Sequence, residues 1–364
     1  MAQTQETDLR AYAVIMAGGN GERFWPLSTP ERPKQFLDLF GARALIRQAV
    51  DRLEGLIPPE RTFVVTAGRF VARTREVLPM LPPENIVGEP CRRDTAPAAA
   101  TACGLVLKAG GPDAVGCILT ADQLIAPAEA FRATLADAIA AAARTGAIVT
   151  MGLVPTRPET GFGYIECGPR VDFGTRTVFH DVRRFVEKPN METARFYLAT
   201  GGFLWNAGMF IWTAAALRAA IREHAPDLAP LVEAVAAGDP ARAVRDLYPG
   251  LRAISFDFAV MERAKKILVA ESRFDWDDVG SWTAVEHHFP QDAAGNTALG
   301  ATLLRETSNA VVVNAPLAEA ENGHLVVVAG LSDVVVVHTP RATLVCARDQ
   351  LKNLKALVRD AQQI

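Results

Sequence analysis

Short apolar runs alternate with longer helix-like segments along the first 285 residues or so of the chain. The runs that are typical of buried strands are residues 13–17, 63–66, 86–88, 115–120 and 148–152. The segments whose pattern predicts helices are residues 45–53, 69–78, 98–109 and 128–145. Strands that alternate with helices predict an α/β fold, with a mostly parallel sheet that is covered on both faces. Because ligands of such sheets bind beyond the carboxyl ends of the strands, we expect functional residues after Ala17, Gly88 and Thr120.

The pattern changes at Asp292, where short β-rich runs replace the alternation. These runs, VVVN, LVVVAG, DVVVVHT and TLVCA, are separated by turns about every ten residues and are followed by a predicted helix at 350–360. They indicate a small module of stacked short strands. We therefore divide the chain into a domain over residues 1–290 and a module over residues 291–364. Exposed short strands invite pairing with another chain, so we expect a homodimer.

Composition and charge fit a soluble globular protein rather than one that is held on a polyanion. The chain has 364 residues, of which 49% are hydrophobic and 22% charged, and its formal net charge is −3. This length predicts two or three domains. A protein that binds nucleic acid or an anionic membrane is usually far more basic, so we expect neither partner. The uncharged run at 196–217 is long enough to cross a membrane, but it lies in mid-chain and contains glycines and Asn206, so we interpret it as buried core.

The amino terminus and the cysteines are typical of a reducing compartment. The first ten residues are polar and include acids, unlike a signal peptide. The five cysteines are odd in number and form no CxxC pair. We therefore expect buried thiols in a cytoplasmic protein rather than disulfides or a zinc site.

A glycine-rich segment follows the first predicted strand and reads GGNGERFWPL, with PKQ a few residues later. Glycines allow backbone N–H groups to approach an anion closely. Phe24 stands where the dinucleotide fingerprint needs a third glycine, and the Gly-Lys-Ser/Thr of a P-loop is absent. Since Arg23 and Lys34 bracket the loop, we expect it to lie extended over a triphosphate. The alternative is a structural turn with solvated basic residues.

Two aspartates far apart in the sequence are candidate ligands of a divalent cation. Asp122 ends a buried strand, and Asp278 lies in a WDDVG turn. If they meet, the two carboxylates make a hard oxygen site for Mg²⁺, which keeps waters and takes its other ligands from phosphates. The alternative for Asp122 alone is a helix cap or a turn residue. We expect Asp277 to lie behind the cation ligands or in solvent.

Glu187, Lys188 and Pro189 follow another apolar strand. The proline favours extended geometry at the lysine, and a compact ammonium suits a phosphate monoester. The alternative is an ordinary ion pair at a strand edge. Lysine is scarce in this chain, since only seven of the 38 basic residues are lysines, yet Lys34 and Lys188 both lie in segments that we assign to phosphate.

The order and spacing of these segments resemble those of the sugar-phosphate nucleotidyltransferases. The glycine-rich string fits the pattern GGxGxRxWPLSxxxxPKQF, in the form used by mannose-1-phosphate guanylyltransferases. The resemblance covers nearly the whole chain and continues through residues 89–97, 119–122, 160–165, 185–189, 205–210 and 276–282. It implies a Rossmann-like, GT-A-like nucleotidyltransferase domain, followed by a small left-handed β-helix.

The activity that the resemblance implies is GTP + α-D-mannose 1-phosphate ⇌ GDP-mannose + diphosphate, with Mg²⁺ or Mn²⁺ as cofactor. Long family members carry an added isomerase domain, which we do not expect here. One alternative keeps the chemistry but uses another sugar 1-phosphate (heptose or glucose) or another base. A remoter alternative is a non-catalytic subunit that senses nucleotide sugars, which should have lost Arg23, Lys34 or a metal aspartate.

The resemblance also assigns roles to individual residues. The implied catalytic residues are Arg23, Lys34, Asp122 and Lys188, and the implied metal ligands are Asp122 and Asp278. The implied sugar-phosphate residues are Gly163, Glu187, Lys188, Asn206 and Gly208. The implied nucleotide-binding residues are Ala17, Gly18, Gly19, Asn20, Gly21, Arg23, Lys34, Glu89, Asp94, Thr95, Ala96 and Asp122.

One of these segments is expected to read the base. Guanine presents N1–H and a 2-amino group on one edge, a pair of donors that a carboxylate accepts with both oxygens. We expect Glu89 to be that acceptor and the backbone near Thr95 and Ala96 to be a partner of O6. The alternative is a loop held by ion pairs of Glu89 with Arg92 or within residues 93–94.

Some positions depart from the family pattern, namely Glu22, Phe24, Thr120 and Gln123. An acid at position 22 beside a triphosphate is unfavourable unless it points away, so we expect only a backbone role there. The six histidines form no metal-binding pattern, and we expect His287 and His288 on different faces of a helix. The five tryptophans are expected in the core or in a pocket wall.

Overall fold

The computed structural model of the chain describes residues 10–19, 21–315 and 324–361. These residues form two compact units, each made of segments that are separate in the sequence. The first unit comprises Met1–Gly18, Ala49–Ala121 and Ile125–Trp276, and the second comprises Gly19–Gln48, Asp122–Leu124 and Asp277–Ile364. The division at residue 290 runs along the chain and stays a prediction, whereas the compact units are discontinuous in sequence.

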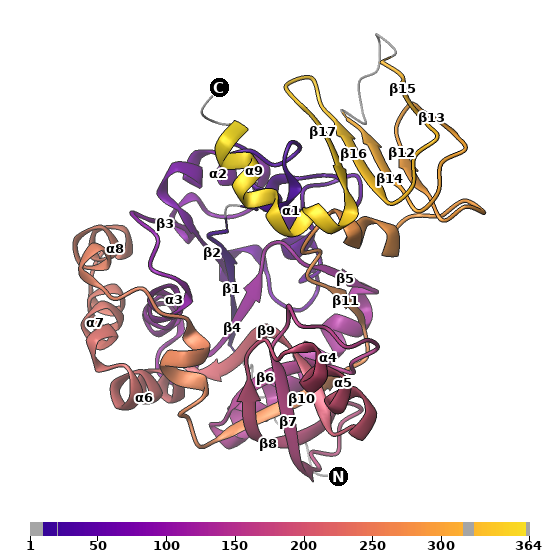
Figure 1. Ribbon diagram of the computed structural model, residues 1–364. Helices are drawn as coiled ribbons and strands as arrows, with labels where there is room; N and C mark the ends of the chain where they lie inside the picture. The colour runs from indigo at the N-terminus through magenta and orange to yellow at the C-terminus, as the bar shows by residue number, and fades with distance from the viewer. Residues whose placement is uncertain (1–9, 20, 316–323, 362–364) are drawn as a thin grey trace. The chain divides into compact units, whose positions relative to one another are not determined.

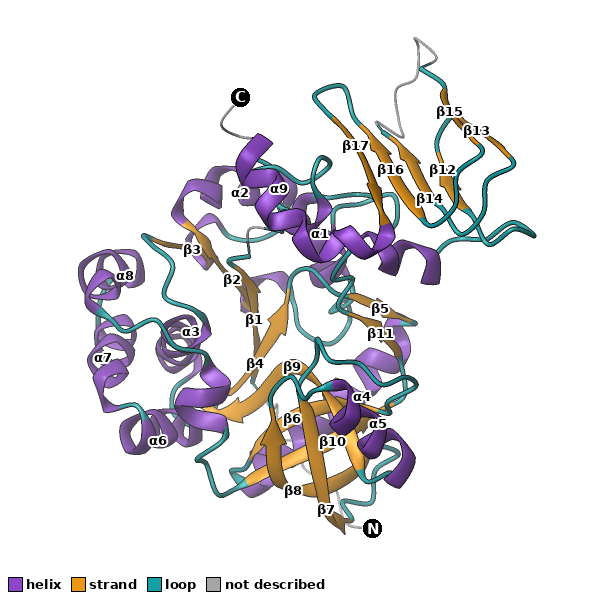
Figure 2. Ribbon diagram, in the orientation of Figure 1, coloured by secondary structure: helices purple, strands orange, loops and turns teal. Residues whose placement is uncertain are grey.

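The first unit is built on a nine-stranded sheet in the order β3-β2-β1-β4-β9-β6-β10-β8-β7 (Figures 1 and 2). Its strands are β1 Ala11–Ala17, β2 Thr62–Ala67, β3 Ile86–Glu89, β4 Val115–Thr120, β6 Ile148–Leu153, β7 Tyr164–Val171, β8 Val178–Val186, β9 Phe203–Thr213 and β10 Ile267–Ser272. All the predicted strands are confirmed, with ends that differ by at most two residues. A separate two-stranded sheet pairs β5 Leu124–Ala126 with β11 Asp275–Asp277.

The nine-stranded sheet is mixed: most of its strands run in one direction, as predicted, but β8 and β9 run against them. β3, β2, β1 and β4 pair in parallel, and so do β6 and β10. β9, however, runs antiparallel to β4, β6 and β7, and β8 runs antiparallel to β7 and β10. A strand that is buried on both faces is an unbroken apolar run whichever way its neighbour points, so the sequence pattern carries no information on direction.

Helices cover both faces of this sheet (Figure 2). Successive side chains of a strand point to opposite faces, and β1 and β4 are buried at nearly every position. α3 packs against β1, β2 and β4, while α4 packs against β4, β6, β9 and β10. The predicted helices are confirmed, although the one at 69–78 starts with a 3-10 turn. The helices up to residue 247 are α1 Leu45–Asp51, α2 Val71–Val77, α3 Thr95–Gly110, α4 Ala128–Thr145, α5 Met191–Thr200, α6 Ala214–His224, α7 Ala229–Ala237 and α8 Pro240–Leu247.

The uncharged run at 196–217 contains the end of α5, all of β9 and the start of α6. β9 lies inside the sheet and is mostly buried, which confirms the core interpretation for that part. The interpretation is wrong for the α5 end, where Phe196 and Leu198 are exposed at 59% and 37%. In the part of the chain that the structure describes, no helix combines the length and hydropathy needed to cross a membrane.

The second unit contains the glycine-rich loop and the C-terminal strands. Its strands are β12 Thr297–Leu299, β13 Thr302–Arg305, β14 Val311–Asn314, β15 Val326–Ala329, β16 Val334–His338 and β17 Thr343–Ala347. β12, β14 and β16 pair in parallel and β13 pairs in parallel with β15, whereas β17 is antiparallel to β16. These pairings confirm a module of stacked short strands. The predicted terminal helix is a 3-10 helix at Arg348–Asn353 and becomes α9 only at Leu354–Ala361.

A common core explains why residues 19–48 belong to the second unit. Phe24 and Leu37 are fully buried in one apolar cluster with Trp282 and with Val311 of β14. The rings of Phe24 and Trp282 pack edge to face, with centroids 5.0 Å apart. Phe24, which departs from the family pattern, is therefore a core residue that holds the glycine-rich loop against this cluster. Its large ring fills space in the core.

All five cysteines are free thiols. Cys103 and Cys117 are buried, and burial raises the pKa of each thiol. The expectation of buried thiols is wrong for Cys91, Cys167 and Cys346, which are half-buried.

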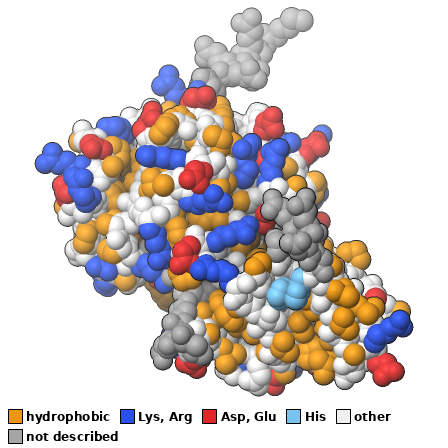
Figure 3. All heavy atoms as spheres, turned by 90° about the horizontal axis from the view of Figure 1, so that it is seen from above, with side chains coloured by type: hydrophobic (Ala, Val, Ile, Leu, Met, Phe, Trp, Pro, Cys, Tyr) orange, Lys and Arg blue, Asp and Glu red, His pale blue; other side chains and the backbone are white. Residues whose placement is uncertain are grey.

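Basic side chains on the surface lie among acidic and apolar ones (Figure 3). Several arginines form ion pairs, for example Arg218 with Glu233 at 2.6 Å and Arg184 with Glu166 at 2.6 Å. Exposed pairs of this kind contribute little to stability. They contrast with Lys34, a cation whose side chain is only 6% exposed.

Candidate active site

Lys34 lies at the centre of a charged cluster in the second unit. Its ammonium forms an ion pair with Asp122 Oδ2 at 3.1 Å and donates to the backbone carbonyl of Asp278. Arg23 lies 3.9 Å from Asp278 Oδ2. The structure therefore brings together four residues that the sequence assigned to phosphate and metal, although they come from three separate segments. We call Arg23, Lys34, Asp122 and Asp278 the phosphate cluster.

The local fold of the glycine-rich loop holds Lys34 in this cluster. Gly21 has a left-handed φ of +60°, and a Cβ there would lie 2.4 Å from the Lys34 backbone nitrogen. Only glycine fits this approach. The Ser28 hydroxyl donates to the Gly21 carbonyl at 2.6 Å, and Lys34 begins the 3-10 helix Lys34–Phe36. Asn20 lies outside the described residues.

The phosphate cluster places two positive side chains, Arg23 and Lys34, beside two carboxylates. Burial raises the pKa of Asp278, and the negative charge of Asp122 adds to that rise, while Lys34 and Arg23 lower it. Two carboxylates with two cations are close to neutral overall. Both carboxylates stay partly exposed, at 35% for Asp122 and 29% for Asp278, so incoming phosphate or a cation has access to them.

Asp277 holds the turn that carries Asp278. It is buried, accepts the Val279 N–H at 2.7 Å and lies 3.1 Å from His288 Nε2. Of the two positions expected for Asp277, solvent is therefore wrong, whereas a place behind the candidate ligand Asp278 agrees with its hydrogen bond inside this turn. His287 Nδ1 is also within 3.6 Å of the same carboxylate oxygen, so the two histidines do not face apart as expected. His287 ends the 3-10 helix Trp282–His287 and His288 is the residue after it, so the separation of side chains in a regular helix does not apply to this pair.

No group of three or more histidine, cysteine or acidic side chains that could hold a metal ion occurs within residues 10–19, 21–315 and 324–361. A Mg²⁺ site built from two carboxylates, with phosphates and waters as the other ligands, is compatible with this finding. The donor set of Asp122 and Asp278, two hard carboxylates beside two cations, fits such an ion chemically.

Glu89 lies in the first unit, at the end of β3, where it approaches the end of β1. A Cβ on Gly18 would be 2.9 Å from Glu89 Oε2. Glu89 Oε1 accepts a hydrogen bond from the hydroxyl of Tyr248, which is fully buried. Burial raises the pKa of Glu89, and the Tyr248 hydroxyl partly offsets that rise. The pKa of Tyr248 is raised by burial and by the Glu89 charge, so the phenol stays protonated and donates.

The ion pairs that were the alternative for this loop do not form among the described side chains. Arg93 donates to the Arg92 and Pro249 carbonyls, and Asp94 caps α3 by accepting the Thr95 N–H at 2.8 Å. The Ala96 N–H donates to the Ile254 carbonyl at 3.0 Å. The backbone N–H groups at 95 and 96 that were expected to face guanine O6 are thus already engaged within the chain.

A second group in the first unit surrounds Asn206, in the middle of β9. A Cβ on Gly163 would lie 2.9 Å from Glu187 Oε2 and 3.5 Å from Asn206 Cβ, so these residues share one small space. The Gly208 N–H donates to Asn206 Oδ1 at 3.1 Å. The structure therefore brings together four of the five predicted sugar-phosphate residues, which we call the sugar group: Gly163, Glu187, Asn206 and Gly208.

The sequence analysis missed Asp257, which accepts from Asn206 Nδ2 at 3.0 Å. Burial, and then the negative charge of Glu187, raises the pKa of Asp257 to about 6. The only local signal is a single acid inside the apolar run ISFDFAVM. Tyr248 was missed as well, because its partner Glu89 lies 159 residues away.

Lys188 has a left-handed φ of +44°, so the expectation of extended geometry before Pro189 is wrong. The Lys188 ammonium forms an ion pair with the carboxylate of its sequence neighbour Glu187. The alternative interpretation, an ion pair at a strand edge, is therefore present in the structure, directly after β8. The side chain is 62% exposed, and an exposed pair of this kind is weak enough to exchange for a phosphate.

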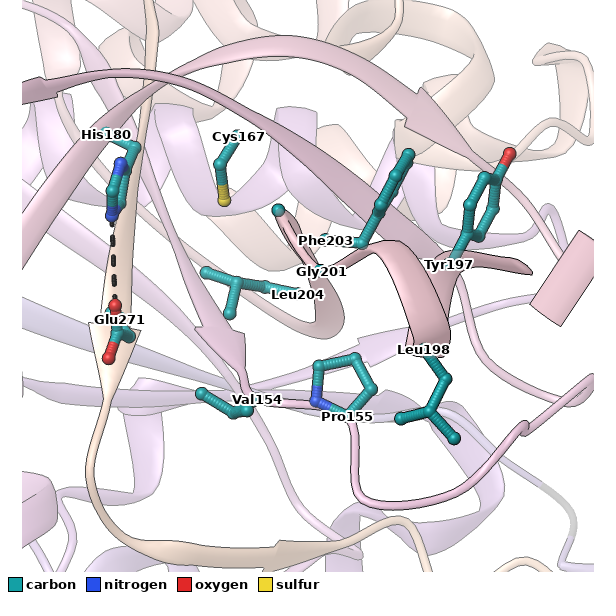
Figure 4. A pocket seen from close by; sticks show the side chains of 11 residues that line it. Val154, Pro155, Cys167, His180, Tyr197, Leu198, Gly201, Phe203, Leu204 and Glu271 are labelled. Atoms are coloured by element: carbon teal, nitrogen blue, oxygen red, sulfur yellow. Dashed lines mark ion pairs between the residues drawn. The ribbon is translucent and has the colours of Figure 1, made fainter. Parts of the chain in front are cut away.

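A pocket of about 320 Å³ lies elsewhere on the first unit (Figure 4). It is mostly apolar, with Cys167 and the pair His180–Glu271 at one side, where Nε2 and Oε2 are 3.7 Å apart. It contains none of the residues that the sequence assigns to nucleotide, sugar or metal.

The sequence profile of the Nucleotidyl transferase family matches residues 12–295, which include every residue of the phosphate cluster and the sugar group. The chain belongs to this family. A second profile, the MannoseP isomerase/GMP-like beta-helix domain, matches residues 306–360. The match confirms a β-helix-like C-terminal module.

Curated relatives and a solved structure are similar to the chain over nearly its full length. A mannose-1-phosphate guanylyltransferase of Escherichia coli K12 is 38% identical over 96% of this chain and 73% of its own length. The alginate biosynthesis protein AlgA of Pseudomonas aeruginosa is 35% identical over 95% and 71%. A crystal structure titled mannose-1-phosphate geranyltransferase, from Thermus thermophilus, superimposes with a TM-score of 0.85, at 35% identity over 97% of this chain and 99% of that one. The chain is therefore a nucleotidyltransferase whose relatives include mannose-1-phosphate guanylyltransferases.

Proposed function

We propose that the chain catalyses GTP + α-D-mannose 1-phosphate ⇌ GDP-mannose + diphosphate. The observation that carries the proposal is the phosphate cluster, in which the buried Lys34 joins the carboxylate of Asp122 to the turn that bears Asp278. The names of the curated relatives support mannose 1-phosphate and GTP as the substrates.

The reaction needs little covalent chemistry from the protein. The attacking group is a phosphate monoester that is already ionised, so it needs no general base and no covalent protein intermediate. Catalysis is then positioning for in-line attack on the α-phosphorus, together with stabilisation of the leaving diphosphate. Arg23, Lys34 and the backbone of the glycine-rich loop would stabilise that charge.

We propose that Asp122 and Asp278 hold Mg²⁺ or Mn²⁺. When bound, the ion supplies positive charge against the phosphates. Lys34 would help to place the two aspartates, because it pairs with the Asp122 carboxylate and donates to the backbone carbonyl of Asp278. Arg23, which is 58% exposed, is free to turn toward a phosphate oxygen.

The sugar and base would be read by the first unit. Glu89 would accept the N1–H and 2-amino donors of guanine, with its carboxylate held by Tyr248. Glu187 and Asn206 would bind sugar hydroxyls. Lys188 would exchange its pairing with Glu187 for the sugar phosphate.

The direct test of this function is product analysis with the purified chain. GTP, mannose 1-phosphate and Mg²⁺ should give GDP-mannose and diphosphate in equal amounts, seen by ³¹P NMR and chromatography. Lys34→Met should form neither product at a rate above about one hundredth of the wild type. Turnover with glucose or heptose 1-phosphate, or with another nucleoside triphosphate, would support the alternative specificities. A folded chain with no turnover would support the nucleotide-sugar-sensing subunit.

We also propose that the C-terminal module is a left-handed β-helix and that the chain forms a homodimer in a reducing, cytoplasmic environment. The parallel pairs β12–β14–β16 and β13–β15 support a β-helix, and the free thiols suit a reducing environment. Exposed apolar side chains on β13, β15 and β17, at Leu303, Val327 and Val345, support self-association. Sedimentation that shows only monomer at micromolar concentration would contradict the dimer.

A further inference from the structure

The side-chain amide of Asn206 has one possible orientation in its hydrogen-bond network. The Gly208 N–H is a donor, so the atom that faces it at 3.1 Å must be Asn206 Oδ1. The Asp257 carboxylate is an acceptor when ionised, so the atom that faces it at 3.0 Å must be Nδ2. Both assignments agree, and the Thr150 hydroxyl lies 3.3 Å from Oδ1 on the same side.

This orientation limits what Asn206 offers to a substrate. Its Oδ1 accepts the Gly208 N–H at 3.1 Å, while the Thr150 hydroxyl, 3.3 Å away, has one hydrogen and lies closer to the Met209 carbonyl, at 3.1 Å. One N–H of Nδ2 is used by Asp257. The amide therefore keeps one N–H that it can donate to a substrate.

Asp257 is held firmly enough to set that orientation. It begins a one-turn π-helix, Asp257–Met261, in which Ala259, Val260 and Met261 are buried, and the preceding Phe256 is buried too. The Phe256 N–H donates to the Thr95 hydroxyl at 2.8 Å, which ties this segment to the start of α3. The carboxylate is thus fixed by backbone that belongs to the core.

The surroundings of Asp257 carry a second carboxylate. Glu187 lies close enough for its charge to raise the pKa of Asp257, and Glu187 Oε2 lies over Gly163. Two carboxylate acceptors beside one oriented amide donor are complementary to a neutral polyol, whose hydroxyl groups each donate and accept.

We propose that Asp257 is a positioning residue for sugar recognition, which fixes the Asn206 amide so that its free N–H points to a ring hydroxyl of a hexose 1-phosphate. The inference rests on the proposed function, because it names a determinant of the same sugar group. It predicts that loss of Asp257 weakens binding of the sugar substrate and leaves binding of the nucleotide substrate unchanged.

The test uses three variants of the full-length chain. Asp257→Leu removes the acceptor, and Asp257→Asn keeps an acceptor oxygen for Asn206 but loses the charge. Asp137→Asn is the matched control, since Asp137 is another carboxylate of the first unit that accepts from a neighbouring side chain, Thr177, at 2.6 Å. We expect Asp257→Leu to raise KM for the hexose 1-phosphate about three- to tenfold, the effect of one misplaced hydrogen bond. Asp257→Asn should have a smaller effect, and KM for GTP should change less than about twofold in both.

Two further readouts separate positioning from general destabilisation. A deoxy analogue that lacks the recognised hydroxyl should be a poorer substrate than its parent for the wild type, but no poorer for Asp257→Leu. The wild type should also lose affinity for the sugar as pH falls through about 6, where Asp257 becomes protonated. Asp257→Asn should not show this loss of affinity near pH 6. The substrate phosphate titrates in the same way with both proteins, so a difference between their pH profiles reports on Asp257.

Equal KM values for the sugar in Asp257→Leu, Asp257→Asn and Asp137→Asn would overturn the inference. If Asp257→Leu is insoluble, the isosteric Asp257→Asn, the deoxy analogues and the pH profile still decide it. A higher wild-type kcat/KM with another hexose 1-phosphate than with mannose 1-phosphate would refute mannose as the substrate, and the KM values of the variants are then compared with that sugar. Failure of the wild type with every hexose 1-phosphate would contradict both proposals.

Discussion

Tyr248 offers a direct test of base recognition. It contacts Glu89, the carboxylate that we propose binds guanine, but it lies outside every sequence motif. Tyr248→Phe removes the hydroxyl that donates to Glu89 Oε1 and keeps the buried ring. Without that donor the Glu89 side chain is free to rotate, and GTP must immobilise it on binding. Immobilising one such side chain costs about 0.5–1.5 kcal/mol, so KM for GTP should rise about two- to tenfold.

The same change should alter the pH dependence of GTP binding. Burial raises the pKa of Glu89 and the Tyr248 hydrogen bond lowers it, so removal of that bond raises the pKa further. Only the ionised carboxylate accepts both donors of guanine. Affinity for GTP is therefore lost as pH falls through the Glu89 pKa, and in Tyr248→Phe this loss should begin at a higher pH than in the wild type.

The assay is initial-rate diphosphate release against GTP concentration, between pH 5.5 and 8.5, with inosine triphosphate as a comparison that lacks the 2-amino group. The matched control is Tyr12→Phe, which removes another tyrosine hydroxyl, one that donates to the Ala109 carbonyl at 3.0 Å away from Glu89. The wild-type preference for GTP over inosine triphosphate should shrink in Tyr248→Phe alone. If both variants keep wild-type KM values, base preference and pH profile, the reasoning about Glu89 is refuted.

Three further predictions concern the phosphate-binding residues. Asp122→Asn should lower kcat about a hundredfold or more and raise the Mg²⁺ concentration needed for half-maximal rate, and an unchanged Mg²⁺ titration would remove Asp122 from the metal site. Lys188→Arg should raise KM for the sugar phosphate despite its conserved charge, because a planar guanidinium replaces a compact ammonium, and wild-type kinetics would refute that requirement. Gly21→Ala should lower the free energy of unfolding by about 1–3 kcal/mol, because its Cβ would meet the Lys34 backbone. Gly19→Ala, whose Cβ meets nothing within 4 Å, should melt like the wild type.

Local sequence patterns predicted the elements whose periodicity is strong. The buried run of β4 and the long helix α4 have the same bounds in the structure as in the sequence analysis. Strand direction could not be predicted, because β9 is apolar on both faces and lies between β4 and β6 without a local mark of its antiparallel course.

In the candidate site, too, the residues in local motifs were predicted, and those that act through distant partners were not. Lys34, Asp122 and Asp278 were predicted because each stands in a recognisable local string, and the structure brings them together. Asp257 and Tyr248 act through partners 51 and 159 residues away, which no local pattern specifies. The backbone of Lys188 was mispredicted, because the proline after it disfavours the α region and favours extended geometry only as a bias, and the φ of Lys188 is left-handed.

The most direct test of the account is diphosphate release by the wild-type chain across four nucleoside triphosphates combined with mannose, glucose and heptose 1-phosphates. The account predicts the highest kcat/KM for GTP with mannose 1-phosphate, and rates at least about tenfold lower when either the base or the sugar is changed, the loss expected for one unpaired buried polar contact. A higher kcat/KM for any other pair, measured with the same Mg²⁺ concentration, would contradict it.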